Sequence, residues 1–237
     1  MNNFFLYIRF GTYMIKTAFK KKQVEKIRKT KGNDEAEKFI NNYVLNWSDY
    51  ILKNVKIDLE VQGLENLPKE NCLYVANHQS LFDIPVLLAG IRRPMGFIAK
   101  KEIKKIKIIS DWMEMINCVF IDRENIRESV KAINKGIDNL KKGHSMVIFP
   151  EGTRNKQGEI GEFKQGSMKL ALKSGVPVVP VAIDGTYKLR EGNKNKKIRP
   201  GKVRLIIKEP IYLDKLDKEY KNKLANNIRE IIKNELS

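Results

Sequence analysis

The chain has 237 residues, of which 42% are hydrophobic and 31% charged, a composition that predicts a globular protein with a real core and excludes an intrinsically disordered one. Its formal net charge is +18, which favours an anionic partner such as a phospholipid, an anionic membrane, an acidic carrier protein or a nucleic acid. A general bias towards lysine would give the same excess, so the charge by itself selects no partner.

The two cysteines and two histidines are too far apart along the chain to suggest a metal site. Cys72 and Cys118 each lie within or beside an apolar run, which predicts buried free thiols in a reducing compartment. His144 precedes an apolar run and is expected in a loop. The sequence therefore predicts neither a metal nor a resident cofactor.

Residues 4–19 form an apolar, aromatic run that contains Arg9 and Lys16 and leads directly into a lysine-rich cluster at residues 20–31. The run is too short and too charged to cross a hydrocarbon core of roughly 30 Å. It also lacks the basic start and the cleavage site of a signal peptide. The pattern is typical of a helix that lies in an anionic membrane interface, and a helix packed on the domain is the alternative.

A second helix is expected over residues 35–53, with Asp34 as its cap. The two helices together predict a membrane-association segment at residues 1–55, followed by a second domain at residues 56–237. Helices and strands alternate in that second domain, which predicts an α/β fold with a mixed, mostly parallel sheet flanked by helices. In such sheets ligands collect at the ends of the strands.

Seven expected strands and five expected helices follow residue 54. The strands are at 55–61, 73–76, 97–99, 118–121, 146–149, 176–183 and 203–207, and the helices begin near Asp83, Ser110, Ser129, Ser167 and Lys218. The last helix is expected to continue to residue 236.

The segment from Asn77 to Asp83 separates a short apolar strand from a buried apolar helix. On one continuous helix His78 and Asp83 would lie about 140° apart, so we expect His78 in a turn and Asp83 at the helix start. A carboxylate beside a histidine fixes the tautomer of the ring and stabilises its charged form, as a general base requires. Alternatively, Asp83 is a plain cap, paired with Ser80 in a capping box, and His78 is an ordinary turn residue.

Four blocks of sequence, in this order, resemble the glycerophospholipid acyltransferase family, and most closely its 1-acylglycerol-3-phosphate acyltransferases. They are His78 to Asp83 with four residues between; Phe97-Ile98-Ala99-Lys100-Lys101-Glu102 with Phe120-Ile121-Asp122-Arg123; Phe149-Pro150-Glu151-Gly152-Thr153-Arg154; and Val176-Pro177-Val178-Val179-Pro180-Val181. The third block, placed after the first, is the most specific of the four. The resemblance implies that residues 56–237 form an acyltransferase catalytic domain.

The resemblance implies acyl transfer from a thioester, on coenzyme A or an acyl carrier protein, to the sn-2 hydroxyl of 1-acyl-glycerol 3-phosphate, giving phosphatidate. His78 would be the base and Asp83 its partner. No Gly-x-Ser-x-Gly elbow is present and neither cysteine lies in a motif block, so we expect direct transfer without an acyl-enzyme. Glycerol 3-phosphate or another lysolipid is an alternative acceptor. A non-catalytic basic module that binds membrane or nucleic acid is an alternative of another class.

The substrate phosphate is expected to need fixed cations and a tight backbone turn. The predicted phosphate-binding residues are Lys100, Arg123, Glu151, Gly152, Thr153, Arg154 and Lys164. The expected partners are lysophosphatidate, the acyl thioester and an anionic membrane surface at the cytoplasmic face of the cell membrane. Basic residues without interleaved aromatics, and the lack of a nucleic-acid motif, argue against nucleic acid.

Overall fold

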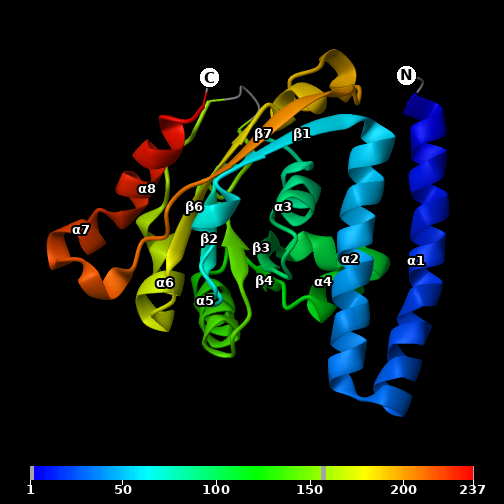
Figure 1. Ribbon diagram of the computed structural model, residues 1–237, viewed down its shortest axis with the longest axis horizontal. Helices are drawn as coiled ribbons and strands as arrows, with labels where there is room; N and C mark the ends of the chain where they lie inside the picture. The colour runs from blue at the N-terminus through cyan, green and yellow to red at the C-terminus, as the bar shows by residue number, and fades with distance from the viewer. Residues whose placement is uncertain (1–2, 156–158, 237) are drawn as a thin grey trace.

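A twisted seven-stranded sheet forms the centre of the protein in a computed structural model that describes residues 3–155 and 159–236 (Figure 1). The strand order is β1-β7-β6-β2-β5-β3-β4. The strands are β1 (Ile57–Gln62), β2 (Leu73–Ala76), β3 (Gly96–Lys100), β4 (Val119–Ile121), β5 (Met146–Ile148), β6 (Val178–Asp184) and β7 (Gly201–Ile207). Neighbouring strands from β6 to β4 are parallel, and β7 is antiparallel to β6, so the predicted mixed, mostly parallel sheet is confirmed.

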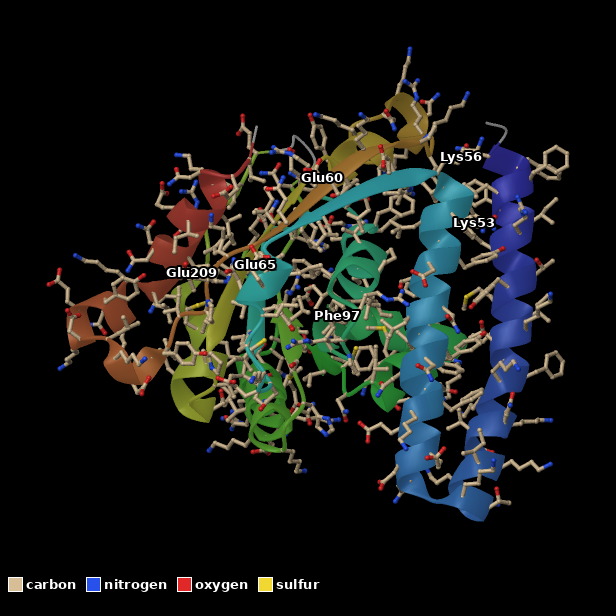
Figure 2. The ribbon with its side chains drawn as sticks, viewed as in Figure 1. Lys53, Lys56, Glu60, Glu65, Phe97 and Glu209 are labelled. Carbon is tan, nitrogen blue, oxygen red and sulfur yellow. The ribbon has the colours of Figure 1, made fainter. Side chains whose placement is uncertain are left out.

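Helices cover both faces of the sheet. They are α1 (Asn3–Lys31), α2 (Asn33–Val55), α3 (Asp83–Ile91), α4 (Lys107–Met115), α5 (Ile126–Lys141), α6 (Lys169–Ser174), α7 (Lys218–Asn222) and α8 (Leu224–Lys233). Successive side chains of a strand point to opposite faces, so Tyr74 of β2 joins the core under α2 and α3 while Val75 joins the core under α5 and α8. Phe97 of β3 lies in the first of these cores, between the sheet and α2 (Figure 2).

The long helices α1 and α2 run antiparallel, with α1 on the outside, farthest from the sheet (Figure 1). Thr17 ties α1 to the protein, because its hydroxyl is 2.8 Å from the hydroxyl of Tyr43 and its carbonyl accepts a hydrogen bond from Trp112 of α4. Large apolar side chains remain exposed on α1, namely Phe4, Phe5, Tyr7, Ile8, Ile15 and Phe19. Among the described residues, no helix combines the length and the apolar character that crossing a bilayer requires.

Two details of the helices differ from the sequence prediction. The predicted cap Asp34 is wrong, because α2 begins at Asn33 after Gly32, whose φ is 91°, and no side chain caps it. The predicted C-terminal helix is two helices, α7 and α8. The side-chain amide of Gln165 occupies the break: it donates to the carbonyl of Lys221 and accepts from the N–H of Ala225, each at 3.0 Å. These bonds satisfy backbone groups that a continuous helix would pair internally.

The carboxyl ends of the parallel strands meet at one edge of the sheet, and the turn that follows β2 is fixed there by Asn77. Its side-chain amide donates to the carbonyl of Ile183 in β6 and accepts from the N–H of the same residue, both at 2.8 Å. A side chain thus extends the pairing of β2 with β6 by one position. The residue that follows, His78, is held at the sheet edge in consequence.

Element boundaries also shift: α4 and α5 each begin three residues before the predicted Ser110 and Ser129, and Val55, predicted to start a strand, ends α2. Other local predictions agree with the structure. Cys72 and Cys118 are buried free thiols, and His144 lies in the loop before β5. Helix α6 ends at Gly175, whose φ of 78° is in the left-handed region that favours glycine.

Candidate active site

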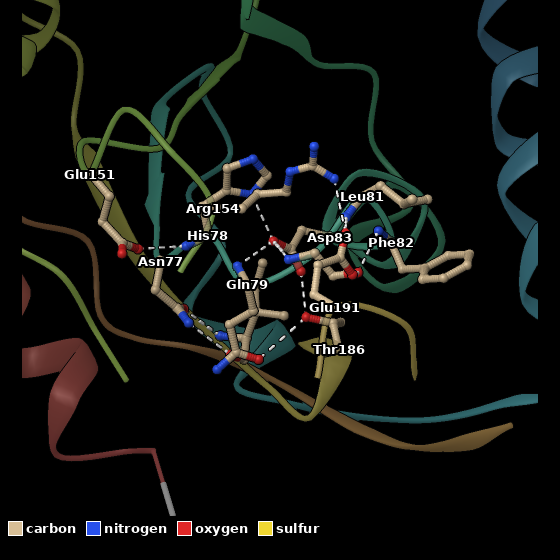
Figure 3. A network of polar contacts seen from close by, with 12 residues as sticks. Asn77, His78, Gln79, Leu81, Phe82, Asp83, Glu151, Arg154, Thr186 and Glu191 are labelled. Atoms are coloured by element: carbon tan, nitrogen blue, oxygen red, sulfur yellow. Dashed lines mark hydrogen bonds and ion pairs between the residues drawn. The ribbon is translucent and has the colours of Figure 1, made fainter. Parts of the chain in front are cut away.

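His78 and Asp83 are in direct contact. Nδ1 of the imidazole is 2.7 Å from Oδ2 of the carboxylate, His78 lies in the turn after β2, and Asp83 is the first residue of α3 (Figure 3). The predicted turn followed by a helix start is therefore confirmed. A carboxylate accepts hydrogen bonds, so Nδ1 carries the hydrogen in this pair and Nε2 keeps a free lone pair.

The Asp83 carboxylate is fully buried, and four donors surround it. Besides His78, Oδ2 accepts the backbone N–H groups of Gln79 at 2.7 Å and Ser80 at 2.9 Å. Oδ1 accepts the hydroxyl of Thr186 at 2.5 Å, from a 3-10 helix directly after β6 (Figure 3). Buried polar groups persist only when they are hydrogen-bonded, so these donors fix the carboxylate in one orientation.

The alternative capping role of Asp83 is also partly present. Its bond from the N–H of Ser80 is one half of a capping box. The other half is missing, because the hydroxyl of Ser80 accepts the N–H of Phe82 and donates to Glu191. One carboxylate thus both organises the start of α3 and contacts the imidazole.

Glu151 holds the backbone of the histidine from the side of β5. Its Oε1 accepts the N–H of His78 at 2.7 Å, and its Oε2 accepts the N–H of Gly161 at 2.9 Å. Burial raises the pKa of the Glu151 carboxyl above its ordinary value, while these two N–H donors act in the opposite direction. Glu151 was predicted to bind substrate phosphate, but both of its oxygens face backbone N–H groups.

The imidazole of His78 also stacks on the ring of Phe149, with 4.1 Å between the ring centroids. Phe149 follows β5 and Asn77 follows β2, and these two strands are neighbours in the sheet. The ring of His78 is therefore fixed by stacking as well as by hydrogen bonding, and its side chain is 19% exposed.

Arg154 lies near the histidine turn and is tied to it through Glu191. Its Nη1 is 2.9 Å from Oε1 of Glu191, whose other oxygen accepts the hydroxyl of Ser80 at 2.5 Å (Figure 3). The Glu191 side chain is only 4% exposed, whereas that of Arg154 is 42% exposed. The remaining N–H groups of the guanidinium are therefore accessible to a ligand.

Two hollows that share Lys164 divide the predicted phosphate-binding residues. The first, of about 670 Å³, is lined by Glu151, Thr153, Arg154, Asn155, Gly161, Glu162 and Lys164. The second, of about 240 Å³, includes Phe149, Gly152, Arg123 and Lys164 in its lining. Arg154 and Arg123 thus lie on different hollows, and Lys100, exposed at the end of β3, belongs to neither lining.

Gly152 marks the turn between the two hollows. Its φ is 74°, in the region that favours glycine, and a Cβ at this position would lie 3.3 Å from Nζ of Lys164. The absence of a side chain at Gly152 thus leaves room for the lysine.

Gln79, Thr186 and Glu191 were not identified from the sequence, although all three belong to the network around His78. The Thr186 hydroxyl, which donates to Asp83, also lies 3.3 Å from Oε1 of Gln79. The sequence does contain one usable signal: Thr186 comes two residues after the end of a buried parallel strand, where functional side chains collect.

Comparison with known proteins gives consistent results. Residues 58–184 match the Acyltransferase family model. The chain is 41% identical over 174 residues to the chloroplastic 1-acyl-sn-glycerol-3-phosphate acyltransferase BAT2 of Brassica napus, covering 71% of this chain and 50% of that protein. It is 38% identical over 180 residues to a probable 1-acyl-sn-glycerol-3-phosphate acyltransferase of Mycoplasma genitalium, covering 70% of this chain and 66% of the relative. The chain thus spans about half the length of the plant protein.

A solved structure is also similar. It is the crystal structure of the 1-acyl-sn-glycerophosphate acyltransferase PlsC from Thermotoga maritima, with a TM-score of 0.80 and 33% sequence identity. The match covers 92% of this chain and 87% of that chain.

Replacing Glu151 with Gln removes a carboxyl whose pKa is raised in the folded protein above the ordinary value of 4.5. The folded state then binds the proton more tightly than the unfolded state, so the contribution of this group to stability is fully present below the unfolded pKa and is lost as pH rises through the folded pKa. We expect the free energy of unfolding of the wild type, minus that of Glu151→Gln, to fall as pH rises above 4.5. Urea unfolding at a series of pH values measures this difference, and all other titrating groups are common to both proteins. A difference that rises with pH would contradict the burial argument.

Proposed function

Because this chain belongs to the acyltransferase family, we propose that it transfers an acyl group from a thioester to the sn-2 hydroxyl of 1-acyl-glycerol 3-phosphate, giving phosphatidate. The observation that carries the proposal is the 2.7 Å contact between His78 and Asp83, at the sheet edge where the third motif block also lies. The names of the relatives from Brassica napus and Mycoplasma genitalium support this choice of acceptor. The thioester is carried by coenzyme A or an acyl carrier protein.

The proposed reaction is direct. Nε2 of His78 takes the proton of the sn-2 hydroxyl while that oxygen attacks the thioester carbonyl carbon. Asp83 stabilises the imidazolium that forms. As the C–O bond forms and the C–S bond breaks, the proton passes from the imidazolium to the leaving thiolate.

The state of the two cysteines supports direct transfer of the acyl group rather than transfer through an acyl-enzyme intermediate. Both are buried, and burial raises the pKa of Cys72 to about 11 and that of Cys118 to about 12. A thiol must form a thiolate to act as a nucleophile, and burial in apolar surroundings opposes this. His78 is therefore proposed to activate the acceptor hydroxyl itself.

The acceptor phosphate is proposed to bind in the larger hollow, which Thr153, Arg154 and Lys164 line. Arginine is suited to this role because its planar fork matches phosphate oxygens. In the acceptor, the phosphate and the reacting hydroxyl are on adjacent glycerol carbons, so the phosphate must bind close to His78. Arg154 meets this condition, since Glu191 links it to the histidine turn.

Helix α1 is proposed to dock the enzyme on an anionic membrane at the cytoplasmic face. Its outer side carries Phe4 and Phe5 at 64% exposure and Phe19 at 68%. The lysines of residues 20–31 continue the same helix, and both features favour an anionic interface.

The central test uses purified protein, a panel of lysolipids and glycerol 3-phosphate as acceptors, and acyl-coenzyme A and acyl-carrier protein as donors, with products identified by mass. We expect phosphatidate from lysophosphatidate.

The mechanism is tested with variants of the histidine and the carboxylate. His78→Ala should abolish the formation of phosphatidate. Asp83→Asn should lower kcat by two orders of magnitude or more. Replacing the triad carboxylate of a serine protease with its amide lowers kcat by about 10⁴. The Asn oxygen can replace Oδ2 and its amide can donate to Thr186, so urea unfolding should change little. Activity that survives His78→Ala would refute the mechanism.

Replacing Arg154 with Gln should raise the KM for lysophosphatidate by about tenfold, because charge-assisted bonds to phosphate are lost. The KM for 1-acylglycerol, which lacks the phosphate, should stay unchanged. Arg190→Gln is the matched control, since Arg190 also approaches Glu191, at 3.6 Å. Equal losses with both acceptors would show that Arg154 acts only through the fold.

Replacing Phe5 and Phe19 together with Ser should lower binding to anionic vesicles by at least tenfold, because each buried phenyl ring contributes about 1.5–3 kcal/mol. Co-sedimentation with vesicles measures this. Leu64→Ser, which removes an apolar side chain that is 48% exposed on another face, is the control. Unchanged binding of the double variant would refute docking through α1.

A further inference from the structure

A groove runs from Phe149, whose ring stacks on the imidazole of His78, to the surface between α5 and α6. It consists of the 240 Å³ hollow at Phe149 and a second hollow of about 210 Å³, which share Arg123, Ser129, Ile133 and Gly166 in their linings. Neither hollow alone reaches the roughly 300–1,000 Å³ of a usual ligand pocket, but the two together do. We call this feature the α5–α6 groove.

The inner end of the α5–α6 groove is mostly apolar and begins at Phe149. Phe149, which stacks on His78, forms part of its wall, together with Ile98, Ile121 and Ile148. The outer end passes Ile126 and Val130 of α5, which are 81% and 52% exposed. A slender and partly apolar ligand would cover these side chains.

Cations follow the groove along its whole length. Arg123 and Lys164 line the inner hollow, and Lys169 and Lys173 line the outer one. The two lysines of α6 are four residues apart, on the same side of the helix. Neither lining includes a carboxylate, and the side chains of Arg123, Lys169 and Lys173 form no hydrogen bond or ion pair with any residue that the structure describes.

We infer that the α5–α6 groove binds the phosphopantetheine arm of the acyl donor, with the arm's phosphate at Lys169 and Lys173. This inference rests on the proposed function. The arm is a narrow chain of amides and apolar carbons with the thioester at one end and a phosphate at the other. The groove offers a matching order, because its isoleucine-lined inner hollow begins at Phe149, which stacks on His78, and its outer hollow adds Lys169 and Lys173.

Other parts of the substrates fit this groove less well. A fatty acyl chain carries no charge, so its binding would not require the four cations that line the groove. The acceptor phosphate is only a few bonds from the reacting hydroxyl, so it cannot reach Lys169 or Lys173, which line only the outer hollow. The donor arm is the substrate part that needs both an apolar path and a distant anion site.

The test compares donors that carry the same acyl chain on coenzyme A, on carrier protein, on 4′-phosphopantetheine or on pantetheine without phosphate. In Lys169→Gln/Lys173→Gln, the KM for acyl-4′-phosphopantetheine, acyl-coenzyme A and acyl-carrier protein should rise by about tenfold. The KM for acyl-pantetheine and for lysophosphatidate should stay at the wild-type value. Wild-type kcat/KM for acyl-coenzyme A and acyl-carrier protein then identifies which source of the arm is preferred.

Lys141→Gln/Lys142→Gln is the matched control, because it removes the same charge from exposed lysines at the other end of α5. It should leave every KM unchanged. Equal effects of the α6 variant on the phosphorylated and unphosphorylated arms, an effect confined to acyl-coenzyme A, or a higher KM for lysophosphatidate would each overturn the inference. A wild-type protein that transfers no acyl group would instead refute the proposed function.

Discussion

The buried carboxylate of Asp83 is the group on which the site depends. It accepts bonds from the imidazole of His78, from two backbone N–H groups of the same turn and from Thr186 beyond β6. Removing a charge from water is costly unless hydrogen bonds replace the lost solvation. The donors of those bonds lie in two different loops. The carboxylate that accepts them therefore holds the loop after β2 to the loop after β6.

Two other carboxylates act on the same turn from other directions. Glu151, after β5, accepts the N–H of His78, and Glu191 accepts the hydroxyl of Ser80 and the N–H of Leu81. The His78 turn is thus held by three acidic side chains in a protein of net charge +18. Accepting carboxylates suit this task because a turn after a strand exposes backbone N–H groups that need partners.

The cations near the site fall into two groups that line different hollows. Arg154 and Lys164 line the open hollow beside the turn, and Lys169 and Lys173 lie at the far end of the α5–α6 groove. A reaction between two anionic substrates needs such a separation, because two phosphates in one site would repel each other. We therefore propose the nearer cations for the acceptor phosphate and the more distant ones for the donor.

Local patterns in the sequence were enough to predict the turn at His78, the start of α3 at Asp83 and the order of the strands along the chain, since each depends on neighbouring residues. Only the tertiary structure decided that Thr186, 103 positions from Asp83, completes the carboxylate network, that Glu191 binds Ser80 from 111 positions away, and that Gln165 divides the C-terminal helix. It also placed Arg123 and Arg154 on different hollows. The physical reason is that these contacts follow from which strands become neighbours in the sheet, and hydrophobic periodicity does not encode that order.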